Sequence, residues 1–347
     1  MRKHTSETSA AAQERESSIS NDHSAHCSKI ASLRMSCSIA IMVAAFVFVA
    51  ATHAQSPTPT LAGRWDLTLN APNKEIPSWI EVSKDQGHDK LVMVGPTDHA
   101  TPLKKFEIHG AEIQFDSPKG EEGFPNGMLF KGKLTGQILE GTVTDAIGDS
   151  WHWTGVRAPK LNRKNPPRWE SSVKLFNGKD LSGWHLLDKI KAGTWKVEGG
   201  SLISTGHGTE LVTDSKFEDF KLHVEFKCGP SSNSGVFLRG RYEVQIETDS
   251  IAEPNSHHTG GVYGFLDPIP EQPRKADVWQ TFDITLIGRR ITVVQNGITI
   301  INDREIPGIT GGALDSHEAL PGPIYFQGTE ENTVMFRNIV ITPAKVE

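Results

Sequence analysis

Short runs in which apolar and polar residues alternate fill the chain from about residue 63 onward. In the first part of the chain they include LVMVG (residues 91–95), FEIHGAEIQF (106–115) and GKLTGQILEGTVTD (132–145), with turn residues between them. Side chains of a β-strand point alternately to its two faces, so this pattern is typical of strands with one buried face. The regular turns predict a meander of antiparallel strands.

The second part of the chain, from about residue 172, has longer runs of the same kind. They are rich in β-branched and aromatic residues, lack a period of 3.6 residues, and include FKLHVEFKC (220–228), QTFDITLIGRRITVVQNGITI (280–300) and TVMFRNIVIT (333–342). A sandwich of two antiparallel sheets is the simplest architecture that buries so many short strands. The 32 Gly and 20 Pro also favour turns over long helices. We therefore expect an all-β protein.

A length of 347 residues favours two domains behind an export segment. The basic, proline-containing stretch 158–171 is the expected linker, and it separates a domain at 55–157 from one at 172–347. The first domain opens with GRWDLTL at Gly63 and ends with WHWTGV at Trp151. Its opening Gly-x-Trp and its Gly-x-Val-x-Asp strand (141–145) resemble those of small lipocalin-like β-barrels. We expect an accessory domain whose tryptophans fill its core rather than line a ligand site.

Residues 1–54 carry the features of an export signal. An apolar run at 37–54 follows basic residues and ends in small ones, which predicts a secretory signal peptide cleaved after Ala54, with Met35 as an alternative start. A retained membrane anchor is the less favoured alternative, because the run falls short of the ~20 apolar residues that a span prefers. The mature protein is thus expected to be periplasmic or secreted.

The charge balance narrows the choice of partners. A net charge of -6 gives no basic surface of the kind that nucleic acids or anionic membranes require, so neither is expected as a partner. Signal cleavage would remove two of the three cysteines and leave Cys228, so no internal disulfide is expected. Core burial must then supply the stability.

The sequence FLRGRYEVQIETD reads as one continuous strand over residues 237–249. Its alternation would place five long polar side chains on one face, namely Arg239, Arg241, Glu243, Gln245 and Glu247. A solvent-facing edge strand would show the same pattern. Because the opposite face is apolar enough to join the core, we favour a groove in which these side chains hydrogen-bond a polyhydroxylated ligand.

Six motifs follow one another in the second part of the chain. They are LFNGKDLSGWH (175–185), TWKVEGGSLIS (194–204), NSGVFLRGRYEVQI (233–246), VWQTFDI (278–284), VVQNG (293–297) and GPIYFQGTEENTVMFRNIVI (322–341). In this order they resemble the 3-keto-disaccharide hydrolase family over roughly residues 174–343. The resemblance implies a concanavalin A-like lectin and glucanase sandwich that takes a carbohydrate substrate. It also implies an enzyme that cleaves the glycosidic bond of 3-keto-glycosides.

A ketone at C3 of a sugar acidifies the proton at C2, so one base can start the cleavage. We expect the base to remove this proton, an enolate to form at C3, the glycosidic oxygen to leave C1, and water to add to the resulting enone. Such a sequence needs a base, an acid for the leaving oxygen and donors around the enolate oxygen. Glu243 is the candidate base, His258 the candidate acid and Arg239 the candidate enolate stabiliser.

Five further residues are candidates for substrate binding: Gln245, Glu247, Tyr263, Trp279 and Gln327. Tyr263 and Trp279 could stack on a sugar ring or fill the edge of the sandwich. Gln327 is included through the family resemblance. No cofactor is expected, and His257 beside His258 only leaves a divalent metal open, because adjacent residues seldom point at one metal.

Two other functions stay open. Glu243, Gln245 and Glu247 resemble the Glu-x-Asp-x-Glu strand motif of lectin-fold glycanases, which would give a glycoside hydrolase acting on unoxidised glycans. Against it, Gln replaces the middle Asp, and residues four apart on a strand lie ~13 Å apart, whereas retaining carboxyl groups lie about 5–5.5 Å apart. The other alternative is a lectin-like module that binds carbohydrate without turnover.

Overall fold

The computed structural model describes residues 60–97, 99–120, 126–189, 194–206, 208–248, 254–329 and 331–345. The predicted signal peptide and the alternative start at Met35 lie outside these ranges. Every contact reported below lies within the compact unit formed by residues 57–347.

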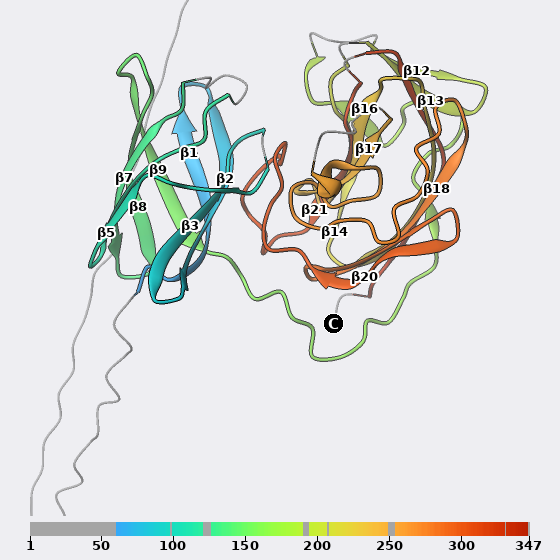
Figure 1. The fold of residues 1–347 in the computed structure, drawn as a ribbon. Coiled ribbons are helices and arrows are strands. Elements are labelled where there is room, and N and C mark those ends of the chain that lie inside the picture. The colour runs from blue at the N-terminus through green and yellow to red at the C-terminus, as the bar shows by residue number, and fades with distance from the viewer. Residues whose placement is uncertain are drawn as a thin grey trace, which may run out of the picture. The chain divides into compact units, whose positions relative to one another are not determined.

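A nine-stranded antiparallel sheet occupies the first part of the described chain (Figure 1). In spatial order its strands are β4 (Thr101–Pro102), β3 (His88–Val94), β2 (Lys74–Asp85), β1 (Gly63–Ala71), β9 (Ser150–Arg157), β8 (Ile138–Thr144), β7 (Leu129–Thr135), β6 (Glu112–Asp116) and β5 (Phe106–His109). The meander is confirmed. The predicted lipocalin-like barrel is not confirmed, because no pairing between β4 and β5 closes the sheet among the described residues.

Aromatic side chains fill the core of the nine-stranded sheet. Trp65 and Trp153 are fully buried there, and Phe115 stacks on Phe130 with 4.6 Å between the ring centroids. The two tryptophans therefore belong to the core, as the sequence predicts.

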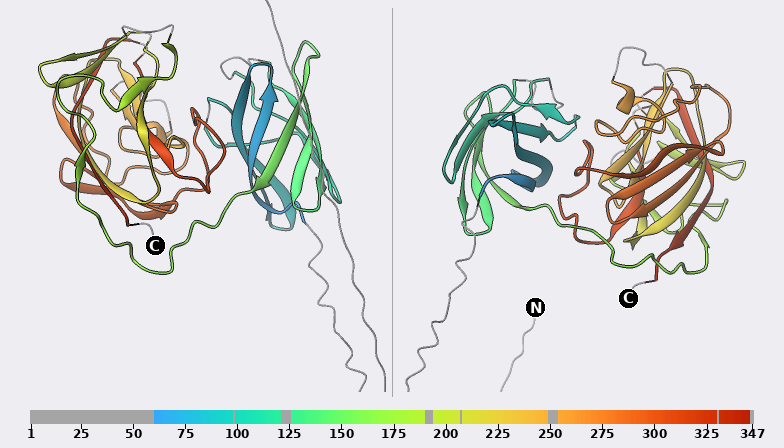
Figure 2. Two further views of the ribbon diagram at one scale, coloured as in Figure 1. Left: turned by 180° about the vertical axis from the view of Figure 1, so that it is seen from behind. Right: turned by 60° about the horizontal axis from the view of Figure 1, so that its bottom comes forward.

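Two antiparallel sheets make up the second part of the chain. One contains, in spatial order, β12 (Trp195–Glu198), β13 (Ser201–Thr205), β22 (Thr333–Pro343), β15 (Phe220–Cys228), β18 (Gln280–Ile287), β19 (Arg290–Gln295) and β20 (Ile298–Glu305), with β10 (Val173–Lys174) paired to β22. The other contains β11 (Trp184–Leu186), β14 (Leu211–Phe217), β21 (Gly322–Phe326), β16 (Asn233–Leu238) and β17 (Tyr242–Glu247). Figure 2 shows both layers from two further sides. The predicted all-β, two-sheet sandwich is confirmed.

Alternating side chains hold the two layers together. Along β15 the apolar residues Phe220, Leu222, Val224 and Phe226 point inward and the residues between them do not. They join one core with Tyr242, Val244 and Ile246 from β17 of the other sheet. Because each buried side chain of this size contributes about 1.5–3 kcal/mol, this shared core is a large source of stability for the sandwich, in which Cys228 is a free, buried cysteine.

The predicted linker runs beside the end of β22. The amide of Glu170 donates to the Pro343 carbonyl (2.9 Å), and the amide of Lys345 donates to the Arg168 carbonyl (2.7 Å). Of the described helical segments, the one that bears on the site is the short 3₁₀ helix η2 (Asn255–His257).

The prediction of one continuous strand over residues 237–249 is wrong. Strand β16 ends at Leu238, which pairs with Tyr242 at the start of β17, and residues 239–241 form the turn between them. Arg239 (φ 55°) and Gly240 (φ 69°) both adopt left-handed backbone conformations, which end the alternation of a strand. Arg239 and Arg241 are therefore turn residues and do not extend the polar face of β17.

Candidate active site

Strand β17 is buried on both of its faces. Tyr242, Val244 and Ile246 point into the core, whereas Glu243, Gln245 and Glu247 share the opposite face, as the sequence predicts. This polar face is covered: the exposed fractions are 5% for Glu243, 2% for Gln245 and 8% for Glu247. Buried carboxyl groups without water cost free energy unless other groups pair with them, so their partners decide what each one does.

Glu243 is the group that lacks partners. Its carboxyl lies over Gly235 of β16: a Cβ atom at Gly235 would stand 2.2 Å from Glu243 Oε1. No hydrogen bond or ion pair connects this carboxyl to another of the residues that the structure describes. Desolvation by burial alone raises the pKa of Glu243 well above its ordinary value, which moves the carboxyl toward the range of a general base.

An apolar cluster adjoins Glu243 on the same face. Tyr325 of β21 stacks on Phe237 of β16 with 4.0 Å between ring centroids, and Val212 and Leu314 complete the cluster. The Tyr325 hydroxyl donates to the Gly312 carbonyl. Burial raises the pKa of Tyr325, and the nearby charge of Glu243 raises it further. Tyr325 is therefore a neighbour of the candidate base.

Residues 310–314 lie along one end of this face. The amide of Glu243 donates to Thr310 Oγ1 (3.1 Å), and the amide of Leu314 donates to the Gly240 carbonyl (2.8 Å). A Cβ at Gly312 would meet the Phe237 ring at 3.0 Å. This segment therefore packs directly on the aromatic pair beside Glu243.

Residues 258–263 pair with the outer edge of β17. The amide of Gly260 donates to the Gln245 carbonyl (2.8 Å), that of Gln245 to the Gly261 carbonyl (2.9 Å), and that of Tyr263 to the Glu243 carbonyl (3.1 Å). The structure thus brings the candidate Tyr263 next to Glu243. The Tyr263 ring stacks on His257 at 4.2 Å, so one of its faces is already occupied.

His258 lies at the other end of β17, in a charged group with Glu247. His258 Nδ1 is 3.0 Å from Glu271 Oε1, and Arg274 stands 3.5 Å from Glu247 and 3.4 Å from Glu271. His258 itself is buried, and neither of its ring nitrogens makes a hydrogen bond to another described residue. The candidate acid and the candidate base therefore sit at opposite ends of one strand.

Arg239 lies on the opposite face of the sheet from Glu243. It is fully buried, and its guanidinium stands over the ring of Tyr242, 6.0 Å from the centroid, on the core side. It donates to the backbone carbonyls of Glu318 and Leu320, the latter at 2.8 Å. The role of enolate stabiliser does not fit this placement, because the guanidinium points away from Glu243 and binds the backbone of residues 318–320.

Trp279 belongs to the other sheet. It precedes β18, and the Arg337 guanidinium of β22 stands 3.8 Å from its ring centroid. Its placement as a stacking platform beside Glu243 is therefore not supported. Gln327, by contrast, follows β21 on the Glu243 face, and its amide donates to the Gly235 carbonyl (3.0 Å).

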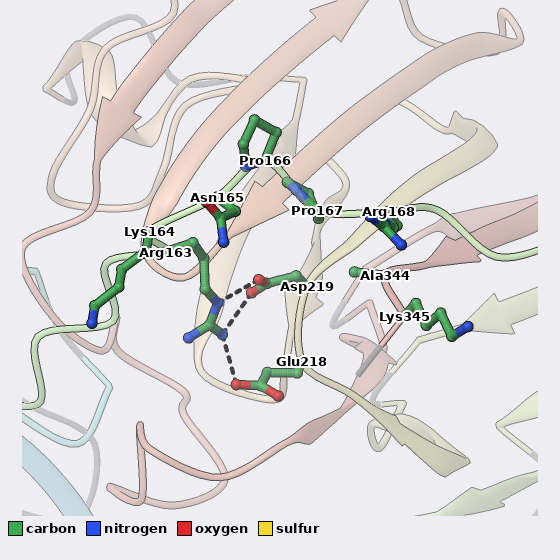
Figure 3. A pocket seen from close by; sticks show the side chains of 10 residues that line it. All are labelled: Arg163, Lys164, Asn165, Pro166, Pro167, Arg168, Glu218, Asp219, Ala344 and Lys345. Atoms are coloured by element: carbon green, nitrogen blue, oxygen red, sulfur yellow. Dashed lines mark hydrogen bonds and ion pairs between the residues drawn. The ribbon is translucent and has the colours of Figure 1, made fainter. Parts of the chain in front are cut away.

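A pocket of about 320 Å³ lies where the predicted linker meets the sandwich (Figure 3). There Arg163 forms ion pairs with Asp219 (2.5 Å) and Glu218 (2.6 Å), while the side chains of Lys164 and Lys345 point away from them. The acidic groups are neutralised and the free cations do not converge, so this pocket does not offer reactive chemistry.

Two features are absent from the parts of the chain that the structure describes. No group of three or more His, Cys, Asp or Glu side chains is arranged there to hold a metal ion. No helix there has the length and apolar composition needed to cross a membrane.

Comparison with known proteins supports the interpretation of the second part of the chain. A model of the 3-keto-alpha-glucoside-1,2-lyase-like domain matches residues 171–342. Residues 171–342 belong to this family. The family expectation drawn from the six ordered motifs is thereby confirmed, with boundaries within three residues of those expected.

Individual relatives are more distant. A 3-keto-disaccharide hydrolase of Bacteroides thetaiotaomicron is 19% identical over 205 residues, which cover 49% of this chain and 71% of the relative. A crystal structure of a candidate glycosyl hydrolase from Parabacteroides distasonis is 26% identical, covers 54% of this chain and 96% of its own, and has a TM-score of 0.42. A β-1,3-1,4-glucanase from a mouse hindgut metagenome is 12% identical, covers 50% of this chain and 99% of its own, and has a TM-score of 0.32.

Sequence reasoning missed Tyr325 and Gly235. Tyr325 is two residues from the candidate Gln327, so strand alternation alone could have placed both on one face. Gly235 gave no such signal. Its role depends on the register between β16 and β17, which sets it diagonally opposite Glu243, and the sequence does not specify that register.

Proposed function

We propose that residues 172–347 cleave the glycosidic bond of 3-keto-glycosides by removing the C2 proton, eliminating the glycosidic oxygen from C1 and adding water to the enone. Membership in the 3-keto-alpha-glucoside-1,2-lyase-like family supports the substrate class. The observation that carries the proposal is the buried carboxyl of Glu243, which has no donor among the described residues and whose pKa is raised by burial.

Glu243 acts as the base in this reaction. Once a sugar with its acidified C2 proton lies against the carboxylate, the proton passes to a Glu243 oxygen while the electron pair forms the enolate at C3. The enolate then re-forms the ketone as the glycosidic oxygen leaves C1 with a proton. Water finally returns its hydroxyl group to C1 and a proton to C2, so the sum is hydrolysis.

A neutral donor, Gln245, is proposed to stabilise the enolate oxygen in place of Arg239. Gln245 already accepts a hydrogen bond from the Ile246 amide through Oε1 (3.0 Å), which leaves its amide nitrogen available to the enolate oxygen. His258 remains the proposed acid for the leaving oxygen, because its Nε2 is buried without a hydrogen bond to any described residue. A substrate lying along β17 from Glu243 to Glu247 would reach both residues.

The geometry disfavours ordinary glycoside hydrolysis by Glu243 and Glu247. Glu247 has the counter-charge of Arg274 at 3.5 Å, and four residues along a strand separate the two backbones by ~13 Å. That is far from the about 5–5.5 Å of a retaining pair. We further propose export, because residues 1–54 carry a signal pattern.

The test uses the purified chain from residue 55 with a 3-keto-disaccharide and its unoxidised parent. The proposal expects release of the reducing-end sugar from the 3-keto substrate alone. Release no faster than in buffer would overturn it. Cleavage of the unoxidised parent, lost in both Glu243→Gln and Glu247→Gln, would establish the glycosidase alternative, and binding without cleavage would establish a lectin-like module.

A further inference from the structure

A row of polar positions crosses the five-stranded sheet one step beyond the aromatic pair. Strands β14 and β21 pair Leu211 with Phe326 and Val212 with Tyr325. The same register places Glu210 opposite Gln327. The amide of Gly208, which donates to the Thr329 carbonyl (3.0 Å), shows that this register continues past Glu210.

The row continues across the next two strands. The backbone N–H of Gln327 donates to the Gly235 carbonyl, and Gly235 pairs with Gln245 of β17. Since Gly235 has no side chain, the carboxyl of Glu243 occupies its place in the row. The order across the sheet is therefore Glu210, Gln327, the Glu243 carboxyl and Gln245.

Glu210 lies on the Glu243 face and close to it. Side chains two apart on a strand share a face, and Val212 packs on Tyr325 on this face while Leu211 points into the core. The charges of both Glu210 and Glu243 act on the Tyr325 hydroxyl. Two strand spacings separate the backbones of β14 and β16, which is about 9–10 Å and comparable to the span of one sugar ring with its hydroxyl groups.

The side chains of Glu210 and Gln327 can each accept further hydrogen bonds. Thr209 Oγ1 donates to Glu210 Oε2 (3.1 Å), and no other described donor bonds the Glu210 side chain. Gln327 Oε1 is buried without a hydrogen-bond partner among the described residues. The buried Gln327 acceptor without a donor costs about 1–3 kcal/mol, and a ligand with hydroxyl groups would relieve that cost, while the half-buried Glu210 carboxylate stays accessible to the same ligand.

We propose that Glu210 is a substrate-contacting residue that, with Gln327, accepts hydrogen bonds from sugar hydroxyls while the same ring presents its C2 proton to Glu243. This inference rests on the proposed function for the identity of the base, and it assigns Glu210 to binding. Carboxylate and amide oxygens spaced across a face form a cradle for vicinal hydroxyl groups.

The test measures binding in the Glu243→Gln background, in which turnover is expected to be slow enough for equilibrium binding to be measured. Titration calorimetry compares this variant with the double variants that add Glu210→Gln or Glu198→Gln, with the 3-keto-disaccharide and its unoxidised parent as ligands. Glu198 is an exposed carboxylate of β12 in the other sheet and serves as the matched control. Thermal unfolding of each variant verifies that it is folded.

The inference predicts that Glu210→Gln weakens binding of at least one sugar about tenfold or more and that Glu198→Gln leaves it unchanged. Equal affinity with and without Glu210→Gln would overturn it, as would the absence of binding by either sugar. Turnover by the unmodified protein, measured in parallel, decides the proposed function separately. If sugar binding depends on Glu210 but the unmodified protein shows no turnover, the inference about Glu210 is supported and the proposed function is wrong.

Discussion

Two buried carboxyl groups lie on opposite faces of the sheet at β17, and their surroundings differ. Glu243 belongs to β17, and Glu318 contacts the preceding residue of this strand, Tyr242. The side chain of Glu318 is fully buried, accepts a hydrogen bond from the Tyr242 hydroxyl (2.6 Å) and has Arg289 at 3.3 Å. Glu243 is almost as deeply buried, and no described residue donates to it. The first arrangement is a satisfied ion pair, and the second leaves the carboxyl for a ligand.

The difference teaches how to tell a structural carboxyl from a reactive one in this molecule. Burial alone does not distinguish them, since it destabilises the charged form of both. The donors do. Around Glu318 they fix a network that also includes Asp66, whose pKa is raised to about 9 by burial first and by the charge of Glu318 second. Around Glu243 burial raises the pKa, and no described donor occupies the carboxyl oxygens.

The largest expected effect is on activity. Glu243→Gln should lower kcat by about 10²–10⁴-fold, the usual contribution of a general base, because the amide cannot take the C2 proton. Its free energy of unfolding should not fall at neutral pH, since the replaced carboxyl has no partner to lose and burial disfavours its charged form. Steady-state kinetics with urea unfolding check both. A stability loss comparable to the activity loss would make Glu243 a second structural carboxyl.

Glu318→Gln should do the reverse. The change removes the closer and more deeply buried of the two carboxylates beside Arg289, the other being Glu305 at 3.6 Å, so we expect the free energy of unfolding to fall by up to about 3–5 kcal/mol. Activity per folded molecule should stay within a few-fold of the original. Denaturant titration measures the stability, and the reaction rate divided by the concentration of folded protein measures the activity. A large drop in this rate would mean that Glu318 is not purely structural.

Gly235→Ala tests whether the carboxyl of Glu243 needs its position over β16. The added Cβ would stand 2.2 Å from Glu243 Oε1, so the carboxyl must move. A displacement of about 1 Å can cost ~10²-fold in rate, and we expect a loss of that order in kcat. Gly229→Ala is the control, because its Cβ would make contacts of 3.4 Å or longer and the residue has no positive φ. Equal activity of the two variants would contradict the assigned position.

The smallest expected effect is the pH dependence of stability. A carboxyl whose pKa is higher in the folded than in the unfolded chain gives a contribution that is fully present below the unfolded value and is lost as pH rises toward the folded one. For Asp66 this window runs from about 3.8 to about 9. Asp66→Asn should therefore gain at least about 1 kcal/mol relative to the original protein between pH 5 and pH 8. Urea unfolding at both pH values is the measurement, and an unchanged difference would contradict the raised pKa.

How far the sequence predicts this molecule depends on which interactions are local. Alternation along β15 and β17 is a local property, so the all-β class and the shared face of Glu243, Gln245 and Glu247 could be predicted. Arg239 could not be placed by alternation, because Arg-Gly-Arg fits a strand pattern equally well and only the pairing of Leu238 with Tyr242 reveals the turn. The position of Trp279 depends on which sheet β18 joins, which is a property of the whole topology.

Partners of buried groups are the least predictable part. The sequence has many glutamates, and nothing in it distinguishes Glu318, 75 residues along the chain from Glu243, as the one with an arginine and a tyrosine beside it. These contacts form between segments far apart in the chain. Gly235 is similar, since its lack of a side chain matters only after the hairpin aligns it with the carboxyl of Glu243.

The central claim is that Glu243 removes the proton from C2, and its most direct test is cleavage of a 3-keto-disaccharide in D₂O. Elimination and hydration replace the C2 hydrogen with one from solvent, so NMR of the first product formed should show deuterium at C2 in each released 3-keto-sugar, above the exchange seen in buffer. Glu243→Gln should abolish this incorporation. Release of a product that keeps protium at C2 would contradict the account, because the glycosidic bond would then have been broken without proton abstraction.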